Sequence, residues 1–159
     1  MSPNQDDAVI EELARMTADF FRAVSFSRGA KPAYVDIFGL FIDSGLLIKN
    51  VGSAPEISSV TEFIRPRQAL VDTGQLTEFH EEEITAVTVV FGNVAHRFSS
   101  YSKSGTQDGT AFRARGMVST QFVKTPAGWK MSAMAWDDER PGLTLPSGFE
   151  TAERCFAQP

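Results

Sequence analysis

The sequence predicts a single α+β domain, with helices in the first half of the chain and antiparallel strands in the second. Apolar residues recur at helical spacing up to Thr73, whereas the segment from Leu76 to Trp136 is rich in β-branched residues and turn signals. A length of 159 residues is ordinary for one domain and is sufficient to bury a sizeable core. Helices that precede a meander of strands are typical of the α+β class.

A long amphipathic helix opens the chain. Pro3 suits the first helical position, and the glycine and proline at positions 29 and 32 end the helix. Its apolar face is formed by Val9, Leu13, Met16, Phe20 and Val24. The pattern then predicts a short second helix over residues 33–41, a turn at 43–45 and a short strand over 46–51.

A capping box marks the start of the next helix. Ser59 and Glu62 have the spacing at which side chain and backbone cap each other, and Gly74 provides the stop. Pro66 lies inside this helix and lacks a backbone donor, so we expect a kink or two short helices.

Four long strands follow. We expect strands at 85–91, 94–102, 111–124 and 129–136, with a tight turn at Gly92-Asn93, a polar loop at 104–109 and a turn at 126–128. After Arg140 the periodicity is lost. The predicted organisation is a domain over residues 1–140 and a C-terminal tail over 141–159.

Charge and hydropathy exclude several classes of function. The net charge is −5 and no run of basic residues occurs, which argues against nucleic-acid binding. No apolar stretch approaches the roughly 20 residues of a membrane span, so we expect no membrane partner. The acidic N-terminus does not resemble a signal peptide, and a cytoplasmic location is expected.

Three segments of the strand region resemble SnoaL-like proteins of the nuclear transport factor two-like superfamily. They are residues 90–101, 115–122 and 128–140, and the resemblance as a whole covers roughly residues 5–140. It implies a cone-shaped α+β barrel, with helices packed in a highly curved antiparallel sheet of four long strands and one short strand, and a cavity at the open end. Members include ketosteroid isomerases, polyketide cyclases, dehydratases and epoxide hydrolases, and homodimers through the sheet are common.

The resemblance argues against ketosteroid isomerase chemistry. Lys49 stands where the aspartate base of those enzymes would lie, and a protonated lysine cannot remove a proton. Phe21 stands near the position of their oxyanion-binding tyrosine and has no hydroxyl group.

His96 is the candidate catalytic residue, because an unperturbed histidine titrates near neutral pH. It shares one strand face with Val94 and Phe98. The alternative is a partly buried histidine that bonds to a neighbouring strand or faces a partner subunit.

The run His80-Glu81-Glu82-Glu83 resembles a metal-binding segment. Neighbouring residues on a strand point to opposite faces, so no more than two of these side chains converge. A solvated strand edge is therefore favoured, and neither a metal nor another cofactor is expected. Arg113 and Arg115 share a strand face and suit either a ligand carboxylate or this acidic run.

The sequence thus predicts a protein that binds a small apolar or aromatic ligand. The expected pocket residues are Phe20, Val24, Tyr34, Phe38, Tyr101, Arg115, Trp136 and Asp137. If the protein is an enzyme, lyase, isomerase or cyclase chemistry without a cofactor fits best. The alternative is a non-catalytic homodimeric module with a closed cavity, and the cavity itself distinguishes the two.

Overall fold

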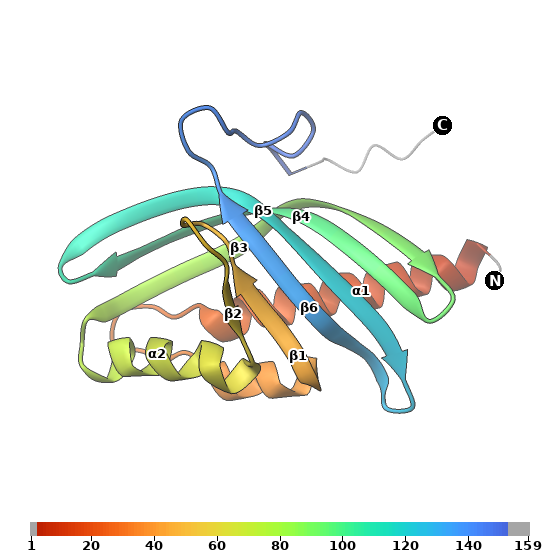
Figure 1. Ribbon diagram of the computed structural model, residues 1–159, viewed down its shortest axis with the longest axis horizontal. Coiled ribbons are helices and arrows are strands. Elements are labelled where there is room, and N and C mark those ends of the chain that lie inside the picture. The colour runs from red at the N-terminus through yellow and green to blue at the C-terminus, as the bar shows by residue number, and fades with distance from the viewer. Residues whose placement is uncertain (1–2, 153–159) are drawn as a thin grey trace.

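The computed structural model describes residues 3–152, in which two α-helices, one 3₁₀ helix and six strands occur (Figure 1). In chain order they are α1 (Pro3–Val24), the 3₁₀ helix η1 (Tyr34–Gly39), β1 (Phe41–Lys49), β2 (Glu56–Ser58), α2 (Val60–Asp72), β3 (Leu76–Phe91), β4 (Val94–Gln107), β5 (Thr110–Thr125) and β6 (Gly128–Asp138). Helical elements therefore precede a meander of long strands, as the sequence predicts.

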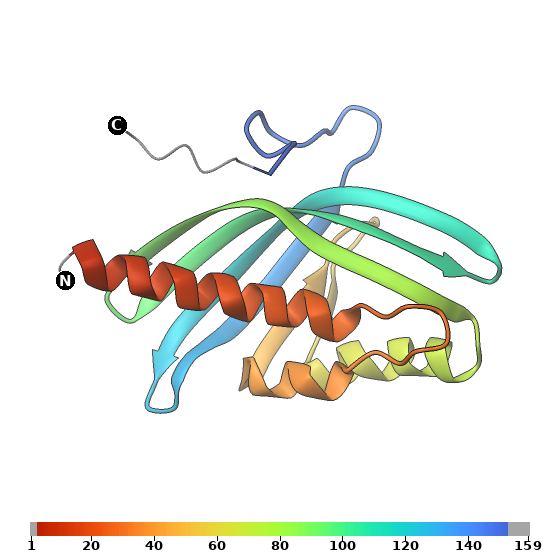
Figure 2. The ribbon, with the colours of Figure 1, turned by 180° about the vertical axis from the view of Figure 1, so that it is seen from behind.

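The strands form one curved sheet in the order β2-β1-β6-β5-β4-β3. All neighbours are antiparallel except β1 and β6, which run parallel. Figure 2 shows α1 lying across one face of the sheet, with η1 and α2 at its lower end. The predicted α+β class and the curved sheet are confirmed. The sheet is mixed and has one more strand than expected, because β2 pairs at the edge and β1 enters beside β6.

The predicted turn at 43–45 is wrong, because β1 runs through it. The pairing of β1 with β6 is irregular between Phe41 and Leu46, which is the mark of a bulge. Gly45 lies within this bulge, where a Cβ atom would stand 2.7 Å from the Phe41 ring. Its presence therefore reflects a close contact inside a strand rather than a turn.

The capping box that starts α2 is confirmed. The Glu62 N–H donates to Ser59 Oγ, and the Ser59 N–H donates to the Glu62 carboxylate, each at 3.1 Å. Gly74, at φ +72°, ends the helix as expected. The chain does not divide into two short helices at Pro66, since α2 is continuous from Val60 to Asp72. The missing proline donor removes one backbone bond, and the capped ends and buried contacts of α2 keep the helix intact.

The β3–β4 hairpin is longer than predicted. β3 begins at Leu76 rather than Thr85, and β4 extends to Gln107 through the segment expected to be a loop. These extensions pair residue by residue, as in Glu81 with Lys103. The polar composition of these extensions is typical of a loop or a sheet edge. In the structure the extensions are strands, and their polar side chains face a cavity or the surface.

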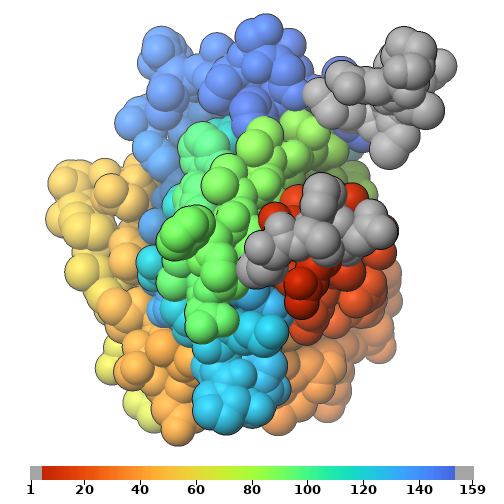
Figure 3. Space-filling view, turned by 90° about the vertical axis from the view of Figure 1, so that its right-hand side faces the viewer, coloured from red at the N-terminus to blue at the C-terminus, as the bar shows by residue number. Residues whose placement is uncertain are grey.

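The segment after β6 packs on the outer face of the sheet. The Leu145 N–H donates to the Glu139 carboxylate at 2.8 Å, and the Phe149 ring contacts Phe98 edge-on with centroids 6.0 Å apart. Figures 1 and 3 show this segment at the end of the sheet remote from η1 and α2. No helix among the described residues is long and apolar enough to cross a membrane.

Candidate active site

A cavity of about 560 Å³ lies between the sheet and the helical elements α1, η1 and α2. Much of its wall is apolar and is formed by Phe20, Phe21, Val24, Phe63, Leu76, Phe79, Val118, Met134 and Trp136. Small-molecule sites commonly have volumes of roughly 300–1,000 Å³. Apolar walls also strengthen the electrostatic interactions of the polar groups that enter the cavity.

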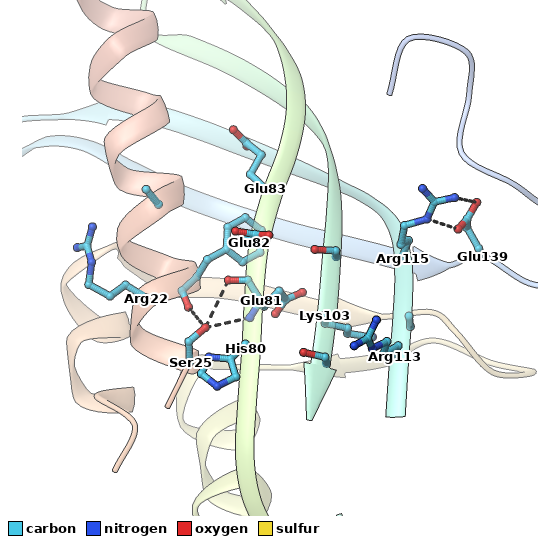
Figure 4. A pocket seen from close by; sticks show the side chains of 15 residues that line it. Arg22, Ser25, His80, Glu81, Glu82, Glu83, Lys103, Arg113, Arg115 and Glu139 are labelled. Atoms are coloured by element: carbon cyan, nitrogen blue, oxygen red, sulfur yellow. Dashed lines mark hydrogen bonds and ion pairs between the residues drawn. The ribbon is translucent and has the colours of Figure 1, made fainter. Parts of the chain in front are cut away.

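Glu81 is the acidic residue that lines this cavity from β3. Its backbone N–H donates to Ser25 Oγ at 3.0 Å, and Ser25 donates to the Phe21 carbonyl at 2.7 Å, which fixes the strand to the end of α1 (Figure 4). Within residues 3–152, no hydrogen bond or ion pair joins the Glu81 carboxylate to another group. The carboxylate is therefore available to a ligand.

The pKa of Glu81 suits proton transfer. Burial raises this pKa from 4.5 to about 7; Lys103 and Arg67 oppose the rise, and Asp138 adds to it. Near neutral pH the side chain is thus present both as a base and as an acid, which is the condition under which a carboxyl group serves in general acid–base chemistry.

Lys103 stands directly opposite Glu81 in the β3–β4 ladder and lines the same cavity. Its Nζ atom lies 2.9 Å from Asp138 Oδ1, and the Tyr101 hydroxyl also donates to Asp138. Gly116 leaves room for this hydroxyl, because a Cβ atom at that position would overlap it. Burial and the bond to Asp138 raise the pKa of Tyr101, so the hydroxyl stays protonated. Asp138 thereby orients the ammonium group, which keeps further N–H donors for a ligand.

Arg67 of α2 and Tyr34 of η1 bring two more polar groups to the cavity. The Arg67 guanidinium carbon lies 3.7 Å from the centre of the Phe63 ring, and Arg67 Nη1 donates to the Phe63 carbonyl at 2.9 Å. Burial raises the pKa of Tyr34 and lowers that of Arg67, while their mutual attraction opposes both changes. At neutral pH both side chains therefore remain hydrogen-bond donors.

A second, more open hollow of about 1130 Å³ adjoins the cavity. Glu81 and Lys103 line both spaces, so they lie at the border between them. Figure 4 shows Arg113 and Arg115 on the neighbouring strand, where Arg115 pairs with Glu139 at 2.8 Å. The smaller cavity is the better candidate for an active site, because apolar side chains form more of its wall and it is less open than the second hollow.

Five of the expected pocket residues line the smaller cavity: Phe20, Val24, Tyr34, Tyr101 and Trp136. They come from α1, η1, β4 and β6, so residues far apart in the sequence meet at one site. The ring of Trp136 also packs edge-on against Phe63, with centroids 6.0 Å apart.

The structure places the other expected residues elsewhere. Phe38 is 51% exposed, because it points away from the core side of η1. Asp137 pairs with Arg140 at 2.8 Å, since it occupies the opposite strand face from Asp138. Arg115 lines the open hollow, on the opposite strand face from Gly116.

His96, the expected catalytic residue, also lies away from the cavity. It is exposed between the buried Ala95 and Arg97, and its ring stacks on Phe98 with centroids 6.1 Å apart. The alternation of β4 therefore turns His96 to the outer face of the sheet.

Four residues of the site are not among those expected from the sequence: Glu81, Lys103, Arg67 and Asp138. The acidic run favours a solvated edge for Glu81, although Glu81 lies two residues from Phe79 and so shares the face of an aromatic side chain. That alternation was the one signal that could have identified it. Asp138 likewise lies two residues from an aromatic side chain, that of Trp136, and so shares its strand face, whereas Asp137 lies on the other face.

Within the described residues, no group of three or more histidine, cysteine, aspartate and glutamate side chains is placed to hold a metal ion. Seven charged side chains line the cavity instead: Lys49, Glu56, Arg67, Glu81, Lys103, Arg113 and Asp138. The hydroxyl-bearing residues Tyr34 and Tyr101 line it with them. These groups can transfer a proton and stabilise negative charge on a ligand.

Solved structures share this fold across most of the chain. A nuclear transport factor 2-like superfamily protein from Salmonella enterica serovar Typhimurium is 13% identical, with 90% of this chain and 97% of that chain covered and a TM-score of 0.71. A ketosteroid isomerase-like protein from Erwinia carotovora atroseptica is 16% identical, with 84% and 96% covered and a TM-score of 0.59. A Catenulispora acidiphila protein in complex with S-DNPA is 10% identical, with 83% and 94% covered and a TM-score of 0.64.

No family model matches the sequence, and no curated protein matches it. The fold of this chain is that of the nuclear transport factor 2-like proteins, as the resemblance implied.

Proposed function

We propose that this protein is a cofactor-independent enzyme that moves a proton on a small apolar or aromatic substrate, in lyase, isomerase or cyclase chemistry. The observation that carries the proposal is the Glu81 carboxylate, which lines an apolar cavity without a protein partner within residues 3–152. The cavity volume favours this proposal over the alternative of a non-catalytic module with a closed cavity.

The proposed reaction begins with proton removal next to a substrate carbonyl. Glu81 accepts the proton, the electron pair moves to the carbonyl oxygen, and the neighbouring Lys103 stabilises the enolate oxygen. Protonated Glu81 then returns the proton to another carbon in an isomerisation, or to a leaving hydroxyl group in an elimination. Lys49 and Phe21 both line the cavity, so Glu81 and Lys103 replace the groups that a ketosteroid isomerase would carry at those two positions.

Deuterium exchange tests the proposed base directly. Small aromatic ketones that raise the thermal midpoint are incubated with the protein in D₂O, and exchange at the carbon next to the carbonyl is followed by NMR. Glu81→Gln is expected to slow enzyme-dependent exchange by about 10²–10⁴-fold, the usual contribution of a positioned general base. His96→Ala is the control and is expected to exchange at the wild-type rate. Equal rates in Glu81→Gln and the wild type would remove Glu81 from this role.

We also propose that the protein forms a homodimer through the outer face of the β3–β4 hairpin. This face carries an apolar strip formed by Val87, Val89, Phe91, Val94 and Phe98, all of them exposed in the single chain. Val89 is 62% exposed and Phe91 is 84% exposed, which is unusual for large apolar side chains gathered on one surface. A second copy of the chain would cover this strip.

A further inference from the structure

Arg67 is a cation of the cavity that forms no close ion pair in the described part of the chain, and Glu81 and Glu56 attract it only from beyond 4.0 Å. Its guanidinium group rests on the Phe63 ring and donates one hydrogen bond to the Phe63 carbonyl. No carboxylate of residues 3–152 lies within 4.0 Å of it. Four cations line the cavity: Lys49, Arg67, Lys103 and Arg113. Lys103 is paired with Asp138, whereas Arg67 packs on the Phe63 ring.

An unpaired guanidinium group in an apolar cavity is energetically unfavourable. Charges taken out of water are normally paired with an opposite charge or with several hydrogen-bond partners. Stacking on Phe63 and one carbonyl bond satisfy only part of the five N–H donors of Arg67. The remaining donors face a space that a ligand can occupy.

Tyr34 supplies a second donor to the same region. Its ring is 3% exposed and buried in the core, and the residue lines the cavity and interacts electrostatically with Arg67. Within residues 3–152, no hydrogen bond to the Tyr34 hydroxyl is formed. The Tyr34 hydroxyl of η1 and the remaining N–H groups of Arg67 on α2 are thus free to donate to a ligand.

We propose that the ligand of this cavity is a carboxylic acid with an apolar or aromatic body, and that Arg67, assisted by Tyr34, binds its carboxylate. This inference rests on the proposed function and names its substrate class. A planar guanidinium group presents two parallel N–H donors that match the two oxygens of a carboxylate. The apolar walls formed by Phe20, Phe63 and Trp136 then bind the body of the acid.

The arrangement also separates binding from chemistry. Arg67 belongs to α2 and anchors one end of the ligand, whereas Glu81 and Lys103 belong to the hairpin and act on another part of it. Binding energy from the carboxylate would thus orient the reacting carbon next to Glu81.

Matched pairs of ligands test this inference. The probes are benzoate with benzamide, 2-naphthoate with 2-naphthamide, and biphenyl-4-carboxylate with its amide, which differ in charge and hardly in shape. Titration calorimetry at pH 7 is expected to show at least one acid that binds tenfold or more tightly than its amide. In Arg67→Met the ratio is expected to fall below threefold while the affinity for the amide is retained. Arg65→Met is the control, because Arg65 is an exposed cation of the same helix that does not line the cavity, and it is expected to keep the wild-type ratio.

Each outcome decides between the two proposals. Equal binding of acid and amide by the wild type would overturn the carboxylate inference and leave the proposed function standing. Binding of no probe would overturn both. A ratio that persists in Arg67→Met would assign the carboxylate to another cation and overturn the role of Arg67. If Arg67→Met fails to fold, Arg67→Lys keeps the charge and loses the paired donors, and a ratio reduced below the wild-type value is expected.

Discussion

Glu81 and Glu83 are the same residue type, two positions apart on the same face of β3, yet their surroundings differ. Glu83 accepts hydrogen bonds from Arg97 Nε at 2.9 Å and from Ser99 Oγ at 2.7 Å. Glu81 lines the cavity, and within residues 3–152 its carboxylate has no such partner. Residue type and strand face are therefore not enough to assign a role. A glutamate on the inner face is structural when its carboxylate is bonded to other side chains, and it is available for chemistry when the carboxylate is not.

Removal of the Glu83 carboxylate has the largest expected effect on stability. Glu83→Ala leaves the guanidinium group of Arg97, a residue that is only 8% exposed, without its counter-charge. The expected loss is about 3–5 kcal/mol of the free energy of unfolding, measured by urea denaturation at pH 7. The double variant Glu83→Leu/Arg97→Met removes both charges and is expected to recover most of this loss. A loss of less than about 1 kcal/mol of the free energy of unfolding in Glu83→Ala would show that Glu83 is not a structural carboxylate and would contradict the comparison with Glu81.

Removal of the Glu81 charge is expected to raise the free energy of unfolding rather than lower it, by an amount that depends on pH. Its pKa is about 7 in the folded protein and near 4.5 when unfolded, so the folded state holds the proton more tightly. The resulting stabilisation is complete below pH 4.5 and is lost as the pH rises from 4.5 through 7, by up to about 3 kcal/mol. Glu81→Gln removes this titration and is expected to be more stable than the wild type at pH 8. Identical pH profiles of unfolding for the two proteins would show that Glu81 is not held in an unfavourable site.

The outer face of the same hairpin is expected to contribute to assembly and hardly to the stability of the single chain. Val89→Asp places a charge in the exposed apolar strip and is expected to convert a dimer to a monomer in sedimentation velocity. The free energy of unfolding of the single chain is expected to change by no more than about 0.5 kcal/mol, as for most surface substitutions. A wild-type protein that sediments as a monomer would refute the dimer, and would leave the comparison between the inner-face glutamates unaffected.

Local signals in the sequence predicted much of the fold. The helical spacing of Leu13 and Phe20, the Ser59–Glu62 capping box and the Gly92-Asn93 turn each depend on a few neighbouring residues, and each is found in the structure. The wrong predictions concern features that depend on contacts between segments far apart in the sequence. Gly45 was interpreted as a turn because its close contact with a ring inside a bulge cannot be seen in the sequence.

The candidate site was predicted less well, because it depends on which strand face points inward. A shift of one residue exchanges the two faces, which separates Asp138 from Asp137 and His96 from Arg97. The apolar wall was easier to predict, since Phe20, Val24 and Trp136 follow from periodicity within single elements.

By itself, the sequence determined the class of fold, the order of its elements and the aromatic content of its interior, because periodicity and capping act between residues close in the chain. Only the tertiary structure decided which charged groups are paired and which face a cavity. Arg97 meets Glu83 across one strand pair, whereas Glu81 and Arg67 are each left without an opposite charge within 4.0 Å among the described residues. Burial and pairing depend on the register and curvature of strands that are remote in sequence, and these set the electrostatic character of each group.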